Sequence, residues 1–552
     1  MWREFFPLDE CRPHQEEALE FIFGALEEAD DLFLELPTGV GKSAIAETVG
    51  LYFEAHSKRS YISTTTVDLE NQYVEDFYDY GLRQLHSSVH YQCPQWTNCD
   101  IGSCTVVEKI EEEGAKDFSQ ADAGGAPGDH VLTQEVKQEK KVLVQRRCPK
   151  SNCPYEIAKE EFEMAAVSIA NSAYLITKAR FVKEFPARSL LIVDEAHKFH
   201  DQITSSYAFV IQHSEIAREA IPDFPGEGDE IDWLTNIYWP FLEYQIKSAN
   251  ARFFALGPRH PEIERARNKV RALLSKKANL NIVLSTDPAE WIFDVVTGER
   301  FSILPVWASR FAPGLMRRMG AKRIFMSATL PDFGRQARWL GIDPDNGRCR
   351  FLSLPSPFPE ENRLIYCHPV VHWDWKNPQP SFDSAARELV RILERHPLQR
   401  GLVHVSSYKQ AEEIIARCNS PRLLTHTDSA ARADVLKRVF ATPGLVLVSP
   451  SSREGLDFFG DRSEFQVVLK LPYASLGDKR VKRRMADDHG WYGLTTAQQL
   501  VQAAGRSVRS MTDVAATYIL DADWPRFVRR NASFIPAYFL KATREMPGPI
   551  QP

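Results

Sequence analysis

The chain has 552 residues, of which 43% are hydrophobic and 26% charged, and its formal net charge is −7. This composition is typical of a large globular protein, and the length predicts about three or four domains. A net negative charge excludes a protein that coats nucleic acid through a uniformly basic surface, although a locally positive channel remains compatible with it. Since no run approaches about 18 apolar residues, we expect that nothing spans a membrane.

The segment 35–43, with the sequence ELPTGVGKS, predicts a phosphate-binding loop. An apolar candidate strand precedes it and residues 44–52 have helical spacing, which is the context that such a loop needs. Glycines let backbone N–H groups surround phosphate oxygens at the start of a helix. We expect Lys42 to bind the β- and γ-phosphates and Ser43 to bind Mg²⁺. The usual pattern has glycine where this chain has Leu36, so a glycine turn with an unrelated lysine is the alternative. The loop residues expected to hold the nucleotide are Pro37, Thr38, Gly39, Val40, Gly41, Lys42 and Ser43.

Five of the nine cysteines lie in one stretch of the chain, which predicts a metal-binding insertion. Thiolates at such short spacings can hold tetrahedral Zn²⁺. Disulfides are not expected, since no signal segment opens the chain and the other thiols are scattered. A Gly/Ala-rich stretch, 115–129, separates Cys104 from Cys148. The five cysteines are Cys93, Cys99, Cys104, Cys148 and Cys153.

A second apolar strand is predicted over 189–193, and it ends in the sequence Asp194-Glu-Ala-His197. A carboxylate at the tip of a strand beside a phosphate loop can hold Mg²⁺ through water, which is the role we expect for Asp194. We expect Glu195 to orient and deprotonate the attacking water. A strand followed by an unrelated charged turn is the alternative, and the phosphate loop that precedes it disfavours that interpretation.

Two further motifs complete the predicted catalytic set. Residues 323–330 predict a strand that ends in the sequence Ser-Ala-Thr. Near the end of the chain, residues 502–509 have the spacing Q-x-x-G-R-x-x-R. On a helix these positions share one face, so we predict that Gln502, Arg506 and Arg509 lie together on a helix. The two guanidinium groups would then stabilise charge on a γ-phosphate, whereas the alternative is an ordinary solvated helix face.

Residues 479–484 carry five basic side chains in an otherwise acidic chain. A path for DNA and a solvated helix face explain this run equally well. Tyr155 and Trp491 are candidate platforms for stacking bases, with burial in a core as the alternative.

In this order along the chain, the motifs resemble those of superfamily 2 helicases, and within that superfamily the XPD and DinG family of iron–sulfur DNA helicases. Further elements extend the resemblance over nearly the whole chain. Arg12-Pro-His-Gln15 resembles the adenine-reading element of the family, and residues 63–66 with 71–72 resemble its motif Ia. Residues 401–407 resemble motif IV, Arg453-Glu-Gly-Leu-Asp-Phe458 resembles motif V, and Ser356-Pro-Phe358 matches a short family landmark.

The resemblance implies additional ligands for the expected cofactors, ATP, Mg²⁺ and a [4Fe–4S] cluster. Arg12, Gln15 and Asp457 join the nucleotide-binding residues. Four of the five clustered cysteines would hold the iron–sulfur cube, with Cys93 and Cys153 resembling the entry and exit ligands and the middle pair left open. Hydroxyl and amide groups suited to DNA phosphates are offered by Thr64, Thr65, Thr66, Gln72, Ser406 and Ser407.

We therefore expect an α/β fold with two RecA-like parallel-sheet motor lobes. The first lobe is assigned to residues 1–90, 157–198 and 306–340, with a Cys-rich iron–sulfur insertion at 91–156 and a mainly helical, arch-like insertion at 199–305. A helix over 261–274 belongs to the latter. The second lobe is assigned to 341–552, with strands at 401–406, 445–449, 465–470 and 516–521.

The expected function is that of an ATP-dependent 5′→3′ DNA helicase, active as a monomer on single-stranded and forked DNA, with R-loops as a further candidate substrate. Its expected location is the cytoplasm, in association with the nucleoid. The alternatives are a translocase that strips proteins or RNA without net unwinding and a catalytically silent, zinc-stabilised nucleic-acid-binding protein. An accessory nuclease is not expected, because the adenine-reading element already begins at Arg12.

Overall fold

The computed structural model divides into two compact units. The first comprises residues 1–84, 165–206 and 304–552, and the second comprises 85–164 and 207–303. The residues that the structure describes are 2–92, 153–181, 185–217, 221–256, 260, 262–374, 376–427, 429–450 and 462–546. No helix within these ranges is both long and apolar enough to cross a membrane.

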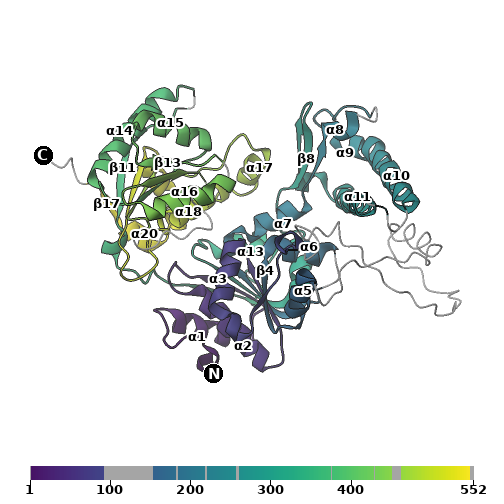
Figure 1. The fold of residues 1–552 in the computed structure, drawn as a ribbon, viewed down its shortest axis with the longest axis horizontal. Coiled ribbons are helices and arrows are strands. Elements are labelled where there is room, and N and C mark those ends of the chain that lie inside the picture. Colours follow the sequence, from purple (N-terminus) through teal and green to yellow (C-terminus); the bar gives the residue numbers. More distant parts are fainter. Residues whose placement is uncertain are drawn as a thin grey trace. The chain divides into compact units, whose positions relative to one another are not determined.

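The first unit contains a seven-stranded sheet whose central strands carry the predicted motifs (Figure 1). Every strand pair in it is parallel. In spatial order the strands are β10 (Cys349–Ser353), β1 (Asp31–Glu35), β9 (Gly320–Ser327), β5 (Arg188–Asp194), β2 (Ser60–Thr64), β4 (Val167–Asn171) and β3 (Arg83–Gln84). Because parallel strands end at the same edge of a sheet, the segments that follow β1, β9 and β5 meet there.

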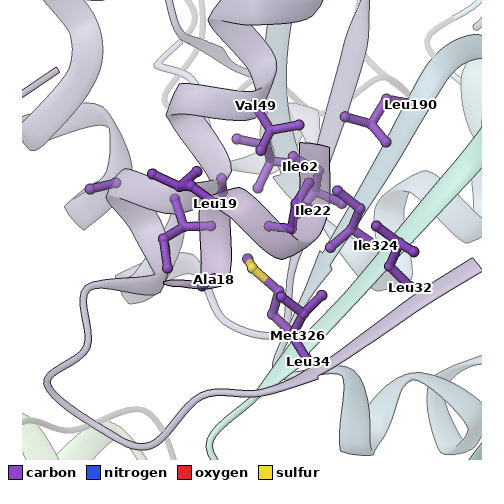
Figure 2. Close-up of a cluster of buried hydrophobic side chains, with 14 of the residues drawn as sticks. Ala18, Leu19, Ile22, Leu32, Leu34, Val49, Ile62, Leu190, Ile324 and Met326 are labelled. Atoms are coloured by element: carbon purple, nitrogen blue, oxygen red, sulfur yellow. The ribbon is translucent and has the colours of Figure 1, made fainter. Parts of the chain in front are cut away.

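The helices beside this sheet bury their apolar faces against strands that are buried on both faces. In β1 all five residues are buried, with Leu32 and Leu34 facing one side and Phe33 stacked on Phe325 of β9 on the other, at 4.6 Å between ring centroids. Figure 2 shows the core on the side of Leu32 and Leu34. The helices are α1 (Gln15–Ala25), α2 (Lys42–Ala55), α3 (Val67–Phe77), α6 (Ser172–Phe181), α7 (Phe199–Tyr207), α12 (Ala312–Met319) and α13 (Phe333–Trp339).

A second seven-stranded sheet in the same unit is also parallel throughout. Its order is β13 (Leu423–Leu424), β14 (Val446–Ser449), β12 (Gly401–His404), β15 (Phe465–Val468), β16 (Ala516–Asp521), β11 (Ile365–Val371) and β17 (Thr543–Glu545). Its helices are α14 (Gln379–Arg395), α15 (Tyr408–Cys418), α16 (Ser429–Ala441), α17 (Lys479–Asp487), α18 (Trp491–Ala504), α19 (Trp524–Asn531) and α20 (Ala537–Lys541). The expectation of two parallel-sheet α/β lobes is confirmed.

One strand lies in a different lobe from the one assigned by sequence. Residues 349–353 fall in the segment expected to form the second lobe, but as β10 they pair with β1 at the edge of the first sheet. The chain therefore crosses between the lobes after Ser353, not near residue 340.

The second unit combines helices with a small sheet that the sequence analysis missed. The sheet has the order β6 (Phe209–Gln212), β8 (Arg300–Pro305) and β7 (Trp291–Val296), with β6 antiparallel to β8. A short turn with Gly298 at φ +74° joins β7 to β8, which is a hairpin signal between two apolar runs. The helices are α5 (Pro154–Met164), α8 (His213–Ile216), α9 (Glu230–Trp233), α10 (Trp239–Ala255) and α11 (Ile263–Leu284).

Candidate active site

The predicted phosphate loop lies between β1 and α2. Gly39 and Gly41 have φ values of +86° and +84°, a region that side-chain-bearing residues rarely adopt. α2 begins at Lys42, directly after the second of these glycines. Leu36, the departure from the usual pattern, is fully buried in the core, and its N–H donates to the carbonyl of Ser327 at 2.8 Å. At this position the backbone continues the hydrogen bonding of β1 with β9, so the glycine-containing loop begins only after Leu36.

Gln15, from the segment Arg12-Pro-His-Gln15 that we expected to read adenine, bonds to this loop. The Nε2 of Gln15 donates to the carbonyl oxygen of Gly41 at 3.2 Å, and Oε1 of Gln15 accepts from the backbone N–H of Arg12 at 2.7 Å. Gln15 is fully buried, so its amide is committed to the loop backbone. Arg12 lines the same cavity as Lys42.

Asp194 is the last residue of β5, and Glu195 follows it directly. Oδ1 of Asp194 accepts from the N–H of Glu195 at 2.8 Å, and its Oδ2 accepts from the hydroxyl of Tyr73 at 2.9 Å. Glu195 has φ +54°, so the chain turns sharply and separates the two side chains. Tyr73, a buried residue of α3, was missed by the sequence analysis. An aromatic residue on an amphipathic helix gives no signal that distinguishes a ligand-orienting hydroxyl from core packing.

The Lys42 ammonium acts to lower the pKa of both carboxyl groups. Burial raises the pKa of Asp194, and the Lys42 ammonium opposes that rise. Burial also acts to raise the pKa of Glu195, but Lys42, His197, Lys198 and Arg506 together lower it to about 2. Glu195 is therefore ionised at neutral pH, and its side chain is 29% exposed, so it can accept a hydrogen bond from water.

Side chains from three motifs meet at the end of α18. The Nε2 of Gln502 donates to Oγ1 of Thr329 at 3.1 Å and lies 2.7 Å from Nε2 of His197. The ring of His197 also lies 2.9 Å from Oγ of Ser327, measured from Nδ1. The DEAH turn, the end of β9 and α18 are thus joined by hydrogen bonds.

The prediction that Arg506 and Arg509 lie on this helix is wrong. α18 ends at Ala504, and both arginines follow it in irregular backbone. Gly505 caps the end of the helix with φ −77°, and the backbone leaves the helical path after it. The next turn is fixed instead by Asp513, whose Oδ2 accepts from the N–H groups of Arg509 and Ser510, each at 2.8 Å.

One cavity of about 680 Å³ gathers most of the predicted nucleotide-site residues. Its lining residues include Thr38, Gly39, Gly41, Lys42, Ser43, Asp194, Glu195, Gln502, Arg506 and Arg509. Cations from both lobes therefore face one space with the two carboxylates, which is the arrangement that phosphoryl transfer needs.

The expected DNA contacts are divided by the structure. Thr65, Thr66 and Gln72 line the same cavity, whereas Thr64 is buried. The hydroxyl of Thr66 caps α3 by accepting from the N–H of Leu69 at 3.3 Å. In the second lobe, Ser406 and Ser407 do not line this cavity. The Ser407 hydroxyl caps α15 by accepting from the N–H of Gln410, and the Ser406 N–H donates to the Gln410 side chain.

Several predicted ligands fall outside the described residues. These are Asp457 of the motif V element and the cysteines Cys93, Cys99, Cys104 and Cys148. Cys153 is described, and it is buried directly before α5. Within the described part of the chain, no group of three or more His, Cys, Asp or Glu side chains is arranged to hold a metal ion.

The basic run forms α17, and its last arginine is not on a solvated face. Arg484 is 2% exposed, its Nε donates to the carbonyl of Val306 at 2.7 Å, and its Nη1 pairs with Asp201 of α7 at 2.7 Å. Its guanidinium also lies 5.0 Å from the ring centroid of Trp307. Trp491 is buried too, which leaves it unable to act as an open stacking platform.

Comparisons with known proteins place both lobes among helicases. Residues 389–543 match the family described as "Helicase C-terminal domain", and residues 9–219 match the family described as "Type III restriction enzyme, res subunit". A probable ATP-dependent helicase of Methanocaldococcus jannaschii is 22% identical over 97% of this chain and 95% of its own length. The ATP-dependent DNA helicase YoaA of Escherichia coli is 29% identical over 31% of this chain and 27% of its own length.

Solved structures show the same fold. An XPD helicase superposes with a TM-score of 0.60 at 15% identity, over 98% of this chain and all of that one. Xpd4 of S. tokodaii gives a TM-score of 0.56 at 14% identity, over 97% of this chain and all of that one.

The two lobes and the cavity that gathers their cations and carboxylates define an ATP-hydrolysing helicase. Its fold is that of the XPD helicases, and together with the sequence matches to ATP-dependent helicases this supports an XPD/DinG-like member of superfamily 2.

Proposed function

We propose that this helicase translocates 5′→3′ on single-stranded DNA, separates duplex DNA and carries a [4Fe–4S] cluster. The proposal depends on one observation above all. Lys42 and Glu195 of the first lobe share a cavity with Arg506 and Arg509 of the second, so hydrolysis can be coupled to the contact between the lobes.

In the proposed reaction, Lys42 binds the β- and γ-phosphates and Glu195 deprotonates the attacking water. The low pKa of Glu195 keeps it ionised for this task. Arg506 and Arg509 balance the charge that develops on the transferred phosphoryl group. Gln502 ties the arginine-bearing turn to His197 beside the base, so the cations and the base are positioned together.

Ser43 and Asp194 are the residues that would hold Mg²⁺. A hydroxyl and a carboxylate suit this cation, and both side chains line the cavity. Both Asp194 oxygens already accept hydrogen bonds from protein donors, which fits a carboxylate that contacts the ion through water. When bound, Mg²⁺ would neutralise charge on the phosphates.

The proposed iron–sulfur site draws support from the residues that flank the Cys-rich segment. The rings of Tyr91 and Tyr155 contact edge to face, with centroids 5.6 Å apart. The hydroxyl of Tyr91 also accepts a hydrogen bond from the backbone N–H of His86 at 3.1 Å. The ring contact between Tyr91 and Tyr155 holds the two ends of the segment close together, as a shared cluster with ligands at Cys93 and Cys153 would require.

We propose that the sugar–phosphate backbone of DNA is contacted by Thr65, Thr66 and Gln72 in the first lobe and by Ser406 and Ser407 in the second. Their hydroxyl and amide groups suit phosphates and carry no base preference. The two insertions, 91–156 and 199–305, would separate the strands. The 5′→3′ direction rests on the resemblance to XPD-like helicases alone.

The direct test uses anaerobically purified protein and matched duplexes that carry only a 5′ tail, only a 3′ tail or a fork. We expect ATP-dependent unwinding of the 5′-tailed and forked substrates, with affinity falling as salt rises. Unwinding from the 3′ tail alone would contradict the proposed direction. Translocation that displaces a bound protein without strand separation would instead favour the translocase alternative.

A further inference from the structure

Residues 354–364 connect the two lobes, since β10 is the last strand of the first sheet along the chain and β11 opens the second. Such a connection must bend or rotate whenever the lobes move against each other. Phe358 lies in the middle of it and is only 6% exposed.

The ring of Phe358 packs directly on the phosphate loop. A Cβ atom built on Gly39 would lie 2.0 Å from Cζ of Phe358 and within 3 Å of two more ring atoms. No side chain could occupy that position without displacing the ring. Gly39 is thus required by its positive φ and also by this close approach.

The same connection is fastened to the turn that carries the two arginines. Asn362 donates from Nδ2 to the carbonyl of Met511 at 2.9 Å, and its own carbonyl accepts from the N–H of Ala515 at 2.9 Å. Phe358 forms a buried cluster with Val508 and Ala515. Since Val508 stands between Arg506 and Arg509 in the chain, the ring contacts the backbone segment from which both guanidinium groups extend.

Arg363 fixes the connection at its other end. Its Nε donates to the carbonyl of Phe358 at 3.2 Å, and its Nη1 donates to the carbonyl of Tyr538 in α20 at 2.8 Å. Phe358 therefore cannot shift independently of the second lobe. Its ring is where residues 354–364, together with the turn that carries Arg506 and Arg509, contact the phosphate loop.

We infer that Phe358 is a positioning residue through which the state of the phosphate loop sets the placement of Arg506 and Arg509. When phosphates bind, Gly39 and its neighbours must turn their N–H groups toward them. Because the ring fills the space over Gly39, that movement is transmitted to Val508. The inference rests on the proposed roles of the loop and the two arginines, and the ring itself touches no reacting atom.

The test compares Phe358→Leu with Phe527→Leu, a matched change at a buried phenylalanine of α19 that does not contact the loop. For Phe358→Leu we expect ADP affinity within about threefold of wild type, while kcat falls by about tenfold or more, since small misplacements of catalytic groups have effects of this size. ADP–aluminium fluoride mimics the transition state, so the preference for binding this analogue over ADP (the analogue preference) should fall by a similar factor. Phe527→Leu should change neither quantity, and Phe358→Met should restore part of the loss.

A double-mutant cycle with Arg509→Ala separates positioning from general damage. If Phe358 acts through the arginine turn, Phe358→Leu should lower kcat by a smaller factor in the Arg509→Ala background, where only Arg506 is left to be misplaced. Losses that multiply would overturn the inference, as would an unchanged analogue preference. If Arg509→Ala itself left kcat unchanged, the proposed site would fail and this inference with it.

Protein stability is measured in parallel by thermal unfolding. A Phe358→Leu protein that is less stable than Phe527→Leu, but has normal kcat and normal analogue preference, would show that the ring only fills a core. Asn362→Ala offers an independent check, because it loosens the connection from Met511 without touching the loop. We expect it to lower kcat and the analogue preference together, and unchanged values would count against the inference.

Discussion

The hydroxyl of Tyr73 donates a 2.9 Å hydrogen bond to Oδ2 of Asp194, across a separation of 121 residues. Tyr73 is fully buried, and burial together with Asp194 raises its pKa, so it stays protonated and remains a donor. The bond fixes one oxygen of the carboxylate that we propose as a Mg²⁺ ligand. Losing a group that orients a metal ligand in this way commonly costs about 10-fold to 100-fold in metal affinity or activity.

Tyr73→Phe should weaken the affinity for Mg²⁺ without unfolding the site. The change removes the O–H group and keeps the ring, so Asp194 loses one orienting donor. We expect the Mg²⁺ concentration for half-maximal ATPase to rise by about 10-fold to 100-fold. Tyr61→Phe is the matched control, since Tyr61 is buried on β2 and its hydroxyl bonds to the carbonyl of Pro186 instead. Equal responses of the two variants to Mg²⁺ would refute a role at the metal site.

Changes at Lys42 and Glu195 should separate nucleotide binding from hydrolysis. Lys42→Ala removes the cation expected on the β- and γ-phosphates, so turnover should be lost. Glu195→Gln should leave ATP bound and lower kcat by about 10²-fold to 10⁴-fold, as expected for loss of a general base. Phosphate release and binding of a fluorescent ATP analogue measure the two effects. Glu54→Gln, an exposed carboxylate change on α2, should behave as wild type.

If Lys42→Ala kept ATPase activity that single-stranded DNA still stimulates, the assignment of this loop would be wrong. If Glu195→Gln lost nucleotide binding, the carboxylate would have a binding role and not the proposed role as base.

The local context of the phosphate loop and the DEAH strand could be predicted from sequence because their chemistry depends on neighbouring residues. A glycine loop between an apolar strand and a helix is a contiguous pattern, and β1 and α2 lie where it indicated. The strands β12, β14, β15 and β16 were likewise marked by apolar runs.

Relationships between distant segments could not be predicted in the same way. The pairing of β10 with β1 depends on which sheet edge is open, and the contact of Tyr73 with Asp194 depends on how α3 packs. For Arg506 and Arg509, helical spacing suggested a shared face, but Gly505 ends the helix first. The shared cavity arises from the turn held by Asp513, which periodicity does not describe.

Glu47 should make the stability of the first lobe depend on pH. It is fully buried in α2, and burial, with a smaller contribution from Glu54, raises its pKa from 4.5 to about 8. Between these values the folded state keeps a proton that the unfolded state releases. Stability should therefore fall as pH rises from about 4.5 to about 8, by up to about 1.4 kcal/mol per pH unit, and then level off.

Glu47→Gln removes this titration, so its melting temperature should gain on wild type progressively between pH 5 and pH 8. Thermal unfolding at pH 5, 6.5 and 8 measures the difference, with Glu20→Gln as an exposed control on α1. A constant offset between Glu47→Gln and wild type across this range would contradict the prediction.

We expect the basic residues of α17 to have two different roles. Arg484 should support the structure, whereas the solvent-exposed residues should not. Arg484→Met should lower the melting temperature, because Arg484 is buried, donates to the carbonyl of Val306 and pairs with the partly exposed Asp201. Lys482 and Arg483 are exposed, so changing both to Met should leave the melting temperature close to wild type. If the helix lies on the DNA path, the double variant should flatten the slope of log affinity against log salt by about 2. An unchanged slope would favour the solvated-face interpretation of the run.

Cys153 offers the sharpest test of the proposed cluster within the described residues. It is buried beside Tyr155, whose ring contacts Tyr91 at the other end of the Cys-rich segment. Freshly purified wild-type protein should be yellow-brown and contain about four iron atoms, as a cube held by four thiolates requires. Cys153→Ser should lose iron and unwinding activity, while ATPase activity survives better, because the proposed phosphate chemistry uses only the two lobes. Cys418→Ser changes a half-buried cysteine of α15 and should retain both iron and unwinding. Colourless wild-type protein with about one zinc ion would instead support the tetrahedral zinc alternative.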